Sequence, residues 1–158
     1  MLRRTLAAAL GAALLLPTRP ARAHDYTLGE LRIGHPWTRA TAGTGAAGGG
    51  FLTIRNTGTQ PDRLLRAESP AAGVVELHTH INDQGVMRMR PVPDIPIPPG
   101  AEVTLAPGGL HLMLINTRQR FDRGGRVPVT LMFERAGRID VELAVEAAGA
   151  RGGGHHGH

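Results

Sequence analysis

Four side chains with metal-binding donors follow one another in the spacing H-x10-M-x21-H-x-M: His78, Met89, His111 and Met113. Thioether sulfur is a soft, neutral ligand and imidazole is a borderline one, so two of each form a neutral set that suits Cu(I). The set is a poor match to Mg²⁺ and Ca²⁺, which prefer oxygen, and to structural Zn²⁺, which usually takes thiolates or several histidines. The sequence contains no cysteine, which excludes the His2Cys centre of blue-copper electron carriers. The pattern therefore predicts a protein that holds Cu(I) and passes it on.

A strict alternation of apolar and other side chains predicts a β-strand around the second histidine. Within residues 110–115 the leucines point to one face, while His111 and Met113 share the other. The Cβ atoms of these two residues would lie roughly 6–7 Å apart along the strand, so both side chains could reach one ion. A methionine with only a packing role would lie on the leucine face, whereas Met113 lies on the opposite face.

The segment around the first histidine alternates in the same way and predicts the first strand of a hairpin. Glu76, His78 and His80 share the face opposite the apolar residues. An Asn-Asp-Gln-Gly turn follows, and the short run after it places Met89 on the return strand. His80 and Met87 lie within reach of the same ion, so both are candidates for an alternative or Cu(II) coordination.

Several segments around and beyond the ligands match one protein family. They are residues 35–40 (HPWTRA), 51–56 (FLTIRN), 75–78 (VELH), 87–92 (MRMRPV), 98–100 (PPG), 105–114 (LAPGGLHLML) and 130–134 (TLMFE). Together with the ligand spacing, they resemble the periplasmic copper chaperones of the PCu(A)C type over residues 28–146. The resemblance implies a cupredoxin-like β-barrel that carries Cu(I) toward cytochrome c oxidase assembly. The recipient would be an oxidase copper subunit, a thioredoxin-like assembly factor or another metalloprotein.

Residues 1–23 are predicted to be a cleaved secretory signal, which places the mature protein in the periplasm. Two arginines precede an apolar run, and Ala21-Arg22-Ala23 forms a small-x-small cleavage site. The run is shorter than the about 20 apolar residues of a membrane span; an uncleaved anchor is the alternative. Removing the segment takes away four of the 18 arginines and none of the 13 acidic residues, so the mature chain carries about +1 rather than +5. The net charge of the mature chain therefore gives no reason to expect nucleic-acid binding. The paired arginines leave Sec and twin-arginine export both open.

Residues 24–148 are predicted to form one all-β domain, a Greek-key β-barrel or sandwich that we expect to be monomeric. Short alternating runs separated by Gly and Pro carry this prediction. We expect the glycine-rich residues 41–50 to be a flexible connection. Residues 91–100 hold five prolines and should form a rigid crossover rather than a central strand. Without disulfides, packing alone must stabilise the domain.

Both ends of the mature chain carry further candidate ligands. Cleavage after Ala23 would leave His24 as the N-terminus, where the free amine and the imidazole could chelate Cu(II); a frayed, solvated end is the alternative. Residues 149–158 are predicted to be a flexible Gly/His-rich tail. Its nitrogen-only donors suit Cu(II) or Zn²⁺ better than Cu(I). The alternative is that the tail binds metal without a functional consequence. These donors are His155, His156 and His158.

Three classes of function are compatible with the sequence. The first is a Cu(I) carrier, either a chaperone that delivers copper or a storage and resistance protein that only keeps it. The second is a β-sandwich interaction module without metal, which the outward histidines and methionines argue against. The third is a redox or copper-dependent enzyme. The sequence offers no Ser-His-Asp set, no cysteine nucleophile and no three-ligand site with an open position, so we expect no enzymatic activity.

Overall fold

The computed structural model describes residues 25–152 of the chain. The predictions for the signal segment, for His24 and for the histidines at positions 155, 156 and 158 fall outside these residues. Within residues 25–152 no helix is long and apolar enough to cross a membrane.

The described residues form eleven β-strands, which confirms the predicted all-β class. In chain order the strands are β1 (Tyr26–Leu28), β2 (Leu31–Arg39), β3 (Gly48–Asn56), β4 (Asp62–Glu68), β5 (Ala72–Asp83), β6 (Val86–Pro91), β7 (Ile95–Ile97), β8 (Glu102–Leu105), β9 (His111–Thr117), β10 (Arg126–Phe133) and β11 (Gly137–Glu146).

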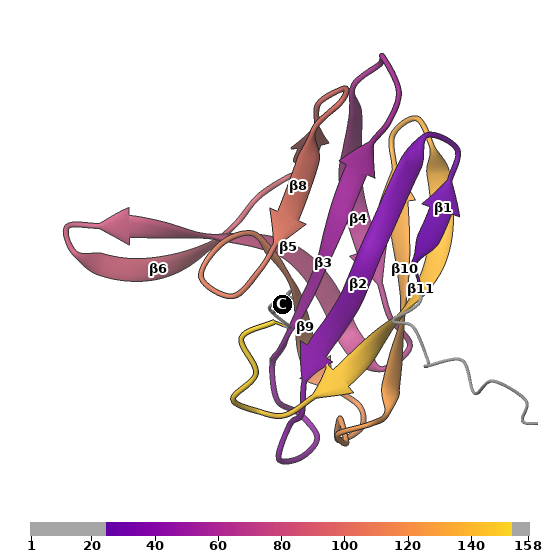
Figure 1. Cartoon of the computed structure of the whole chain (residues 1–158). Helices are drawn as coiled ribbons and strands as arrows, with labels where there is room; N and C mark the ends of the chain where they lie inside the picture. The colour runs from indigo at the N-terminus through magenta and orange to yellow at the C-terminus, as the bar shows by residue number, and fades with distance from the viewer. Residues whose placement is uncertain (1–24, 153–158) are drawn as a thin grey trace, which may run out of the picture.

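The strands follow one path through the sheet, in the order β6-β5-β9-β3-β2-β11-β10-β4-β7, with β1 added to β2 and β8 added to β3. The β11–β2 pair is parallel and the other pairs are antiparallel. The path does not close on itself, so the domain is a sandwich rather than a closed barrel (Figure 1).

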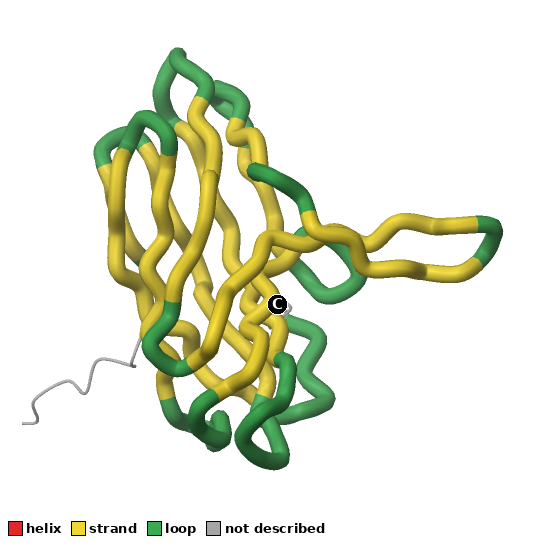
Figure 2. Tube along the Cα trace, turned by 180° about the vertical axis from the view of Figure 1, so that it is seen from behind, coloured by secondary structure: helices red, strands yellow, loops and turns green. Residues whose placement is uncertain are grey.

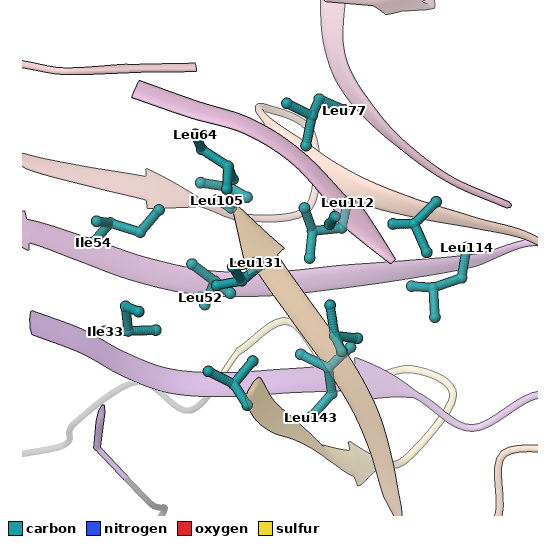
Figure 3. Close-up of a cluster of buried hydrophobic side chains, with 14 of the residues drawn as sticks. Ile33, Leu52, Ile54, Leu64, Leu77, Leu105, Leu112, Leu114, Leu131 and Leu143 are labelled. Carbon is teal, nitrogen blue, oxygen red and sulfur yellow. The ribbon is translucent and has the colours of Figure 1, made fainter. Parts of the chain in front are cut away.

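An apolar core fills the space between the layers and stabilises the domain without disulfides. Side chains from many strands meet there, because alternate residues of each strand point to the same face. Figure 3 shows this cluster, which includes Leu112 and Leu114 of β9, Leu52 of β3 and Leu143 of β11. All four are at most 2% exposed. The alternation predicted for residues 110–115 therefore places the leucines as expected.

The hairpin of β5 and β6 projects from the side of the sandwich (Figures 1 and 2). Its turn begins after Asp83, and Gln84 and Gly85 both have positive φ. β6 is an edge strand, because it ends the path through the sheet. The predicted hairpin is thus present, with Met89 on its return strand.

Two local predictions need correction or refinement. Residues 48–50 are not a flexible connection but the start of β3. A Cβ atom on Gly49 would lie 2.6 Å from Cζ of Phe51, so this glycine makes room for a ring rather than for motion. The proline-rich residues 91–100 contain the short strand β7, which pairs only with β4 at the end of the sheet. Proline is tolerated there because an edge strand needs fewer ladder donors.

Candidate metal centre

Strand register brings the predicted ligands of β5, β6 and β9 onto one face. His78 lies directly opposite His111 in the antiparallel β5–β9 pair, and His80 lies opposite Met89 in the β5–β6 pair. Residues that face each other across an antiparallel pair share one side of the sheet. The same register puts Glu76 opposite Met113.

A cavity of about 290 Å³ opens on this face. Three of the four predicted ligands line it, namely Met89, His111 and Met113, and so does His80. His78 is not among the lining residues, although its ring centroid is 5.6 Å from that of His111. The other lining residues are Arg39, Gly49, Phe51, Pro107 and Gly108.

His111 is buried, at 3% exposure, and does not point into solvent as a simple inside-outside alternation would place it. Its Nδ1–H donates to the carbonyl of Gly109 at 2.9 Å, which leaves the Nε2 lone pair free for an ion. Burial lowers the pKa of His111, and the nearby His80 and His78 act in the same direction, while the Gly109 carbonyl opposes them. The environment therefore favours the neutral imidazole, which is the form that binds metals.

His80 lies closer to the cavity than its predicted secondary role implies. Its ring centroid is 5.1 Å from that of His111, and its Nδ1 is 3.3 Å from the same Gly109 carbonyl. Met87, the other secondary candidate, does not line the cavity and is 56% exposed. The alternation along β6 gives Met87 and Met89 the same face, and their positions along the projecting hairpin separate them.

His78 makes a close contact of its own. Its Nε2–H donates to the Glu76 carboxylate at 2.7 Å. The other ring nitrogen, Nδ1, is buried and has no hydrogen-bond partner among the described residues. The sequence placed Glu76 on the correct face, but nothing in the local pattern indicated this bond.

An aromatic and cationic wall closes the cavity on the side of β2 and β3. The Phe51 ring lies 4.6 Å from the Trp37 ring and 6.5 Å from the His111 ring, measured between centroids. The Arg39 guanidinium lies over Phe51 at 5.9 Å, and its Nε–H donates to the Ala150 carbonyl at 2.8 Å. The predictions did not name Trp37, Arg39 or Phe51 as site residues, although the segments HPWTRA and FLTIRN contain them.

The chemistry of the donors limits which ion fits. Residues 25–152 contain no group of three or more His, Cys, Asp or Glu that could hold a metal ion. Met89 and Met113 add two thioether sulfurs to the imidazoles that line the cavity. Soft Cu(I) accepts such ligands, whereas Mg²⁺ and Ca²⁺ prefer oxygen.

Comparisons with known proteins give consistent matches. The sequence model of one family, described as "LpqE-like: Putative lipoprotein LpqE-like", matches residues 31–145. The chain is 31% identical over 137 residues to "Putative lipoprotein Lxx21020" of Leifsonia xyli subsp. xyli, covering 83% of this chain and 81% of that protein.

Two similar solved structures carry copper in their descriptions. The copper-bound PCuAC domain from PmoF2 aligns with a TM-score of 0.67 and 32% identity, over 78% of this chain and 98% of that one. The solution structure of Cu(I)-DR1885 from Deinococcus radiodurans aligns with a TM-score of 0.54 and 25% identity, over 72% and 78% of the two chains.

Proposed function

The chain belongs to the LpqE-like family and to the PCuAC type of copper chaperone domain, and from this premise we propose that it is a periplasmic carrier of Cu(I). It binds one ion through Met89, Met113, His111 and an imidazole of β5, with His78 as the predicted ligand. The ion is then delivered to a copper-accepting protein.

The observation that carries the proposal is the meeting of neutral, soft and borderline donors at one cavity. Met89 and Met113 line it together with His111 and His80, and His78 lies beside His111. Two methionines and two histidines carry no net charge when the imidazoles are neutral, so the bound ion keeps its single positive charge. Such a set suits Cu(I).

The graded exposure of the ligands supports release by ligand exchange. Met89 on the projecting hairpin is 46% exposed, whereas His111 on β9 is 3% exposed. An incoming thiolate or imidazole of the recipient therefore meets Met89 first and displaces the ligands one after another. The buried His111 holds the ion until the new bonds have formed.

The hairpin also offers a surface for the recipient. Six large hydrophobic side chains are exposed among the described residues, and five of them lie on β5 or β6. Val74 is near the start of β5, whereas Ile81, Val86, Met87 and Met89 lie around the turn of the hairpin. Exposed apolar groups gathered beside a cargo site are typical of a contact with another protein. From the resemblance, this recipient is an oxidase copper subunit or a thioredoxin-like assembly factor, in cytochrome c oxidase assembly.

Export follows from the signal-like residues 1–23 and is supported by the relative's name as a lipoprotein. Two contacts hold the described part of the predicted tail against the domain. Gly152 lies beside Trp37 and Ala150 accepts a hydrogen bond from Arg39, so the last described residues pack near the cavity. His155, His156 and His158 lie outside the described residues, and we propose that they capture Cu(II).

The first experiment is an anaerobic Cu(I) titration of the mature protein against a chromophoric chelator. We expect tight one-to-one binding that weakens by at least ~10-fold, or about 1.4 kcal/mol, in Met89→Leu and in Met113→Leu. Met132→Leu is the matched control, because Met132 lies on β10 away from the cavity. Wild-type affinity in both cavity variants would refute the site.

The tail is tested in the same assay by changing His155, His156 and His158 to alanine. Substitution is preferable to truncation from residue 149, because Ala150 and Gly152 pack against the domain. Cu(I) binding should persist without the three histidines. Complete loss of binding would instead identify a metal scavenger on an ordinary sandwich.

Delivery and storage differ in whether the bound Cu(I) is transferred to a second protein. The Cu(I)-loaded protein, mixed with a copper-free oxidase CuA domain, should lose its copper to that domain within the mixing experiment. Retention of the ion against a recipient of higher affinity would favour the alternative of a storage or resistance protein.

A further inference from the structure

We propose that Glu76 is a positioning residue for copper, and that it holds the His78 ring so that Nδ1, rather than Nε2, binds the ion. The inference rests on the proposed function and specifies how one of its ligands is held. It assigns a role to a carboxylate that is not itself a ligand.

The contact between the two side chains is short and directional. Nε2 of His78 lies 2.7 Å from Oε2 of Glu76, and a carboxylate can only accept, so Nε2 carries the proton. Glu76 and His78 are two residues apart on β5 and share one face of the strand. The His78 side chain is 12% exposed and that of Glu76 is 44% exposed, so the carboxylate occupies the rim and the imidazole lies beneath it.

The second ring nitrogen supplies the independent observation. With the proton on Nε2, Nδ1 of His78 carries a lone pair, and this atom is buried without a hydrogen-bond partner among the described residues. Leaving a buried acceptor unsatisfied is unfavourable, because the atom has lost its hydrogen bonds to water. A bound ion would satisfy it, and Nδ1 is the ring atom that no protein group already holds.

His111 shows the complementary arrangement across the β5–β9 pair. There the Gly109 carbonyl takes Nδ1–H and leaves Nε2 free, while in His78 the Glu76 carboxylate takes Nε2–H and leaves Nδ1 free. The two rings are 5.6 Å apart and inclined at 60°. Metal-binding histidines usually donate their other N–H to a carboxylate or carbonyl, which fixes the ring and strengthens the donor.

The negative charge of Glu76 would also favour binding of the positive ion. Cu(I) on neutral ligands brings one positive charge to a partly buried face that already contains Arg39. Glu76 lies opposite Met113 in the strand register and is the carboxylate bonded to a proposed ligand. Its negative charge offsets that of the ion without occupying a coordination position.

The atom assignment is tested by long-range ¹H–¹⁵N NMR of the histidine rings in the full mature protein, before and after anaerobic addition of Cu(I). We expect copper to shift Nδ1 of His78 and Nε2 of His111. A copper-dependent shift of Nε2 in His78 would overturn the proposal. So would an unshifted His78 together with a shifted His80, since the β5 ligand would then be His80.

The role of Glu76 is tested by Cu(I) competition titration of Glu76→Ala and Glu76→Gln. Loss of such a supporting partner typically weakens metal affinity by about 10–100-fold, which is expected for alanine. Glutamine keeps an acceptor oxygen and should weaken binding less. Glu102→Gln is the matched control, an exposed strand carboxylate that does not line the cavity.

The ring N–H of His78 gives a second readout, because its proton should exchange slowly in the wild type and rapidly in Glu76→Ala. Wild-type affinity and proton exchange in the alanine variant would overturn the positioning role while leaving the carrier function intact. A wild-type protein that fails to bind Cu(I) one-to-one would overturn the proposed function itself, and this inference with it.

Discussion

At the scale of single residues, the surroundings of a donor determine whether it can bind copper. His111 is the clearest case, because its imidazole is buried against Phe51 and its Nδ1–H is held by the Gly109 carbonyl. Burial lowers its pKa from the ordinary value of 6.5. The ring therefore stays neutral, and able to bind a metal, at pH values where an exposed histidine would be protonated.

The same shift predicts how the stability of the copper-free protein depends on pH. The folded protein binds a proton at His111 less readily than the unfolded chain does. The free energy of unfolding should therefore be unaffected by this residue above pH 6.5 and fall as the pH is lowered through that value toward the folded-state pKa. We expect urea unfolding to show a smaller loss in His111→Asn than in the wild type. Identical pH profiles for the two proteins would contradict the buried, neutral assignment.

At the scale of the elements, the proposed site depends on how three strands fit together, two of which form a hairpin. β9 contributes His111 and Met113, β5 contributes the other histidines, and β6 returns Met89 to the cavity. A shift of one residue in either register would turn these side chains to the opposite face. The pairing of β3 with β9 puts Gly49 opposite Met113. Because Gly49 has no side chain, the Phe51 ring can cover this part of the site.

Gly49→Ala tests this packing. The new Cβ would lie 2.6 Å from Cζ of Phe51, and that ring is 4% exposed and packed against Trp37, so it has little room to move. We expect a loss of about 1–3 kcal/mol in the free energy of unfolding, as for other overpacked sites. Cu(I) affinity should also fall, because the displaced ring lines the cavity.

Gly43→Ala is the matched control for this experiment, since a Cβ at that position meets no atom within 4 Å. Its unfolding and its copper binding should both match the wild type. Equal behaviour of the two glycine variants would show that the Phe51 ring adapts freely.

At the scale of the whole molecule, the sandwich core and the metal site share one strand. Leu112 is fully buried in the core (Figure 3). His111 and Met113, on either side of it in the chain, line the cavity. The proposed ligands are therefore held by the same packing that holds the domain together, and the sequence has no cysteine to form a disulfide.

Leu112→Ala should lower the free energy of unfolding of the copper-free protein by about 2–5 kcal/mol, through lost burial and a residual cavity. Cu(I) binds the folded state and should raise the melting temperature of this variant, as it does for any ligand of the native state. Thermal unfolding with and without Cu(I) measures both effects. Val74→Ala is the control, because Val74 on β5 is 47% exposed and should change stability by less than about 0.5 kcal/mol.

The sequence by itself determined the all-β class and the β5–β6 hairpin, and it predicts the donor set. These features follow from local patterns: period-2 alternation in 110–115, a turn composition after Asn82, and the types of ligand at fixed spacing. It also excluded a thiolate copper centre, because cysteine is absent from the sequence.

Only the tertiary structure decided that His80 lines the cavity, that His111 is buried, that Glu76 holds His78, and that Gly49 makes room for Phe51. Cross-strand register and the folding of the sheet into two layers join residues that are far apart in the chain. Alternation assigns each side chain to one of the two faces of its strand, and it puts both histidines of β5 on the same face. Which one reaches the cavity depends on the twist of the hairpin and on the side chains brought in by β2, β3 and β9.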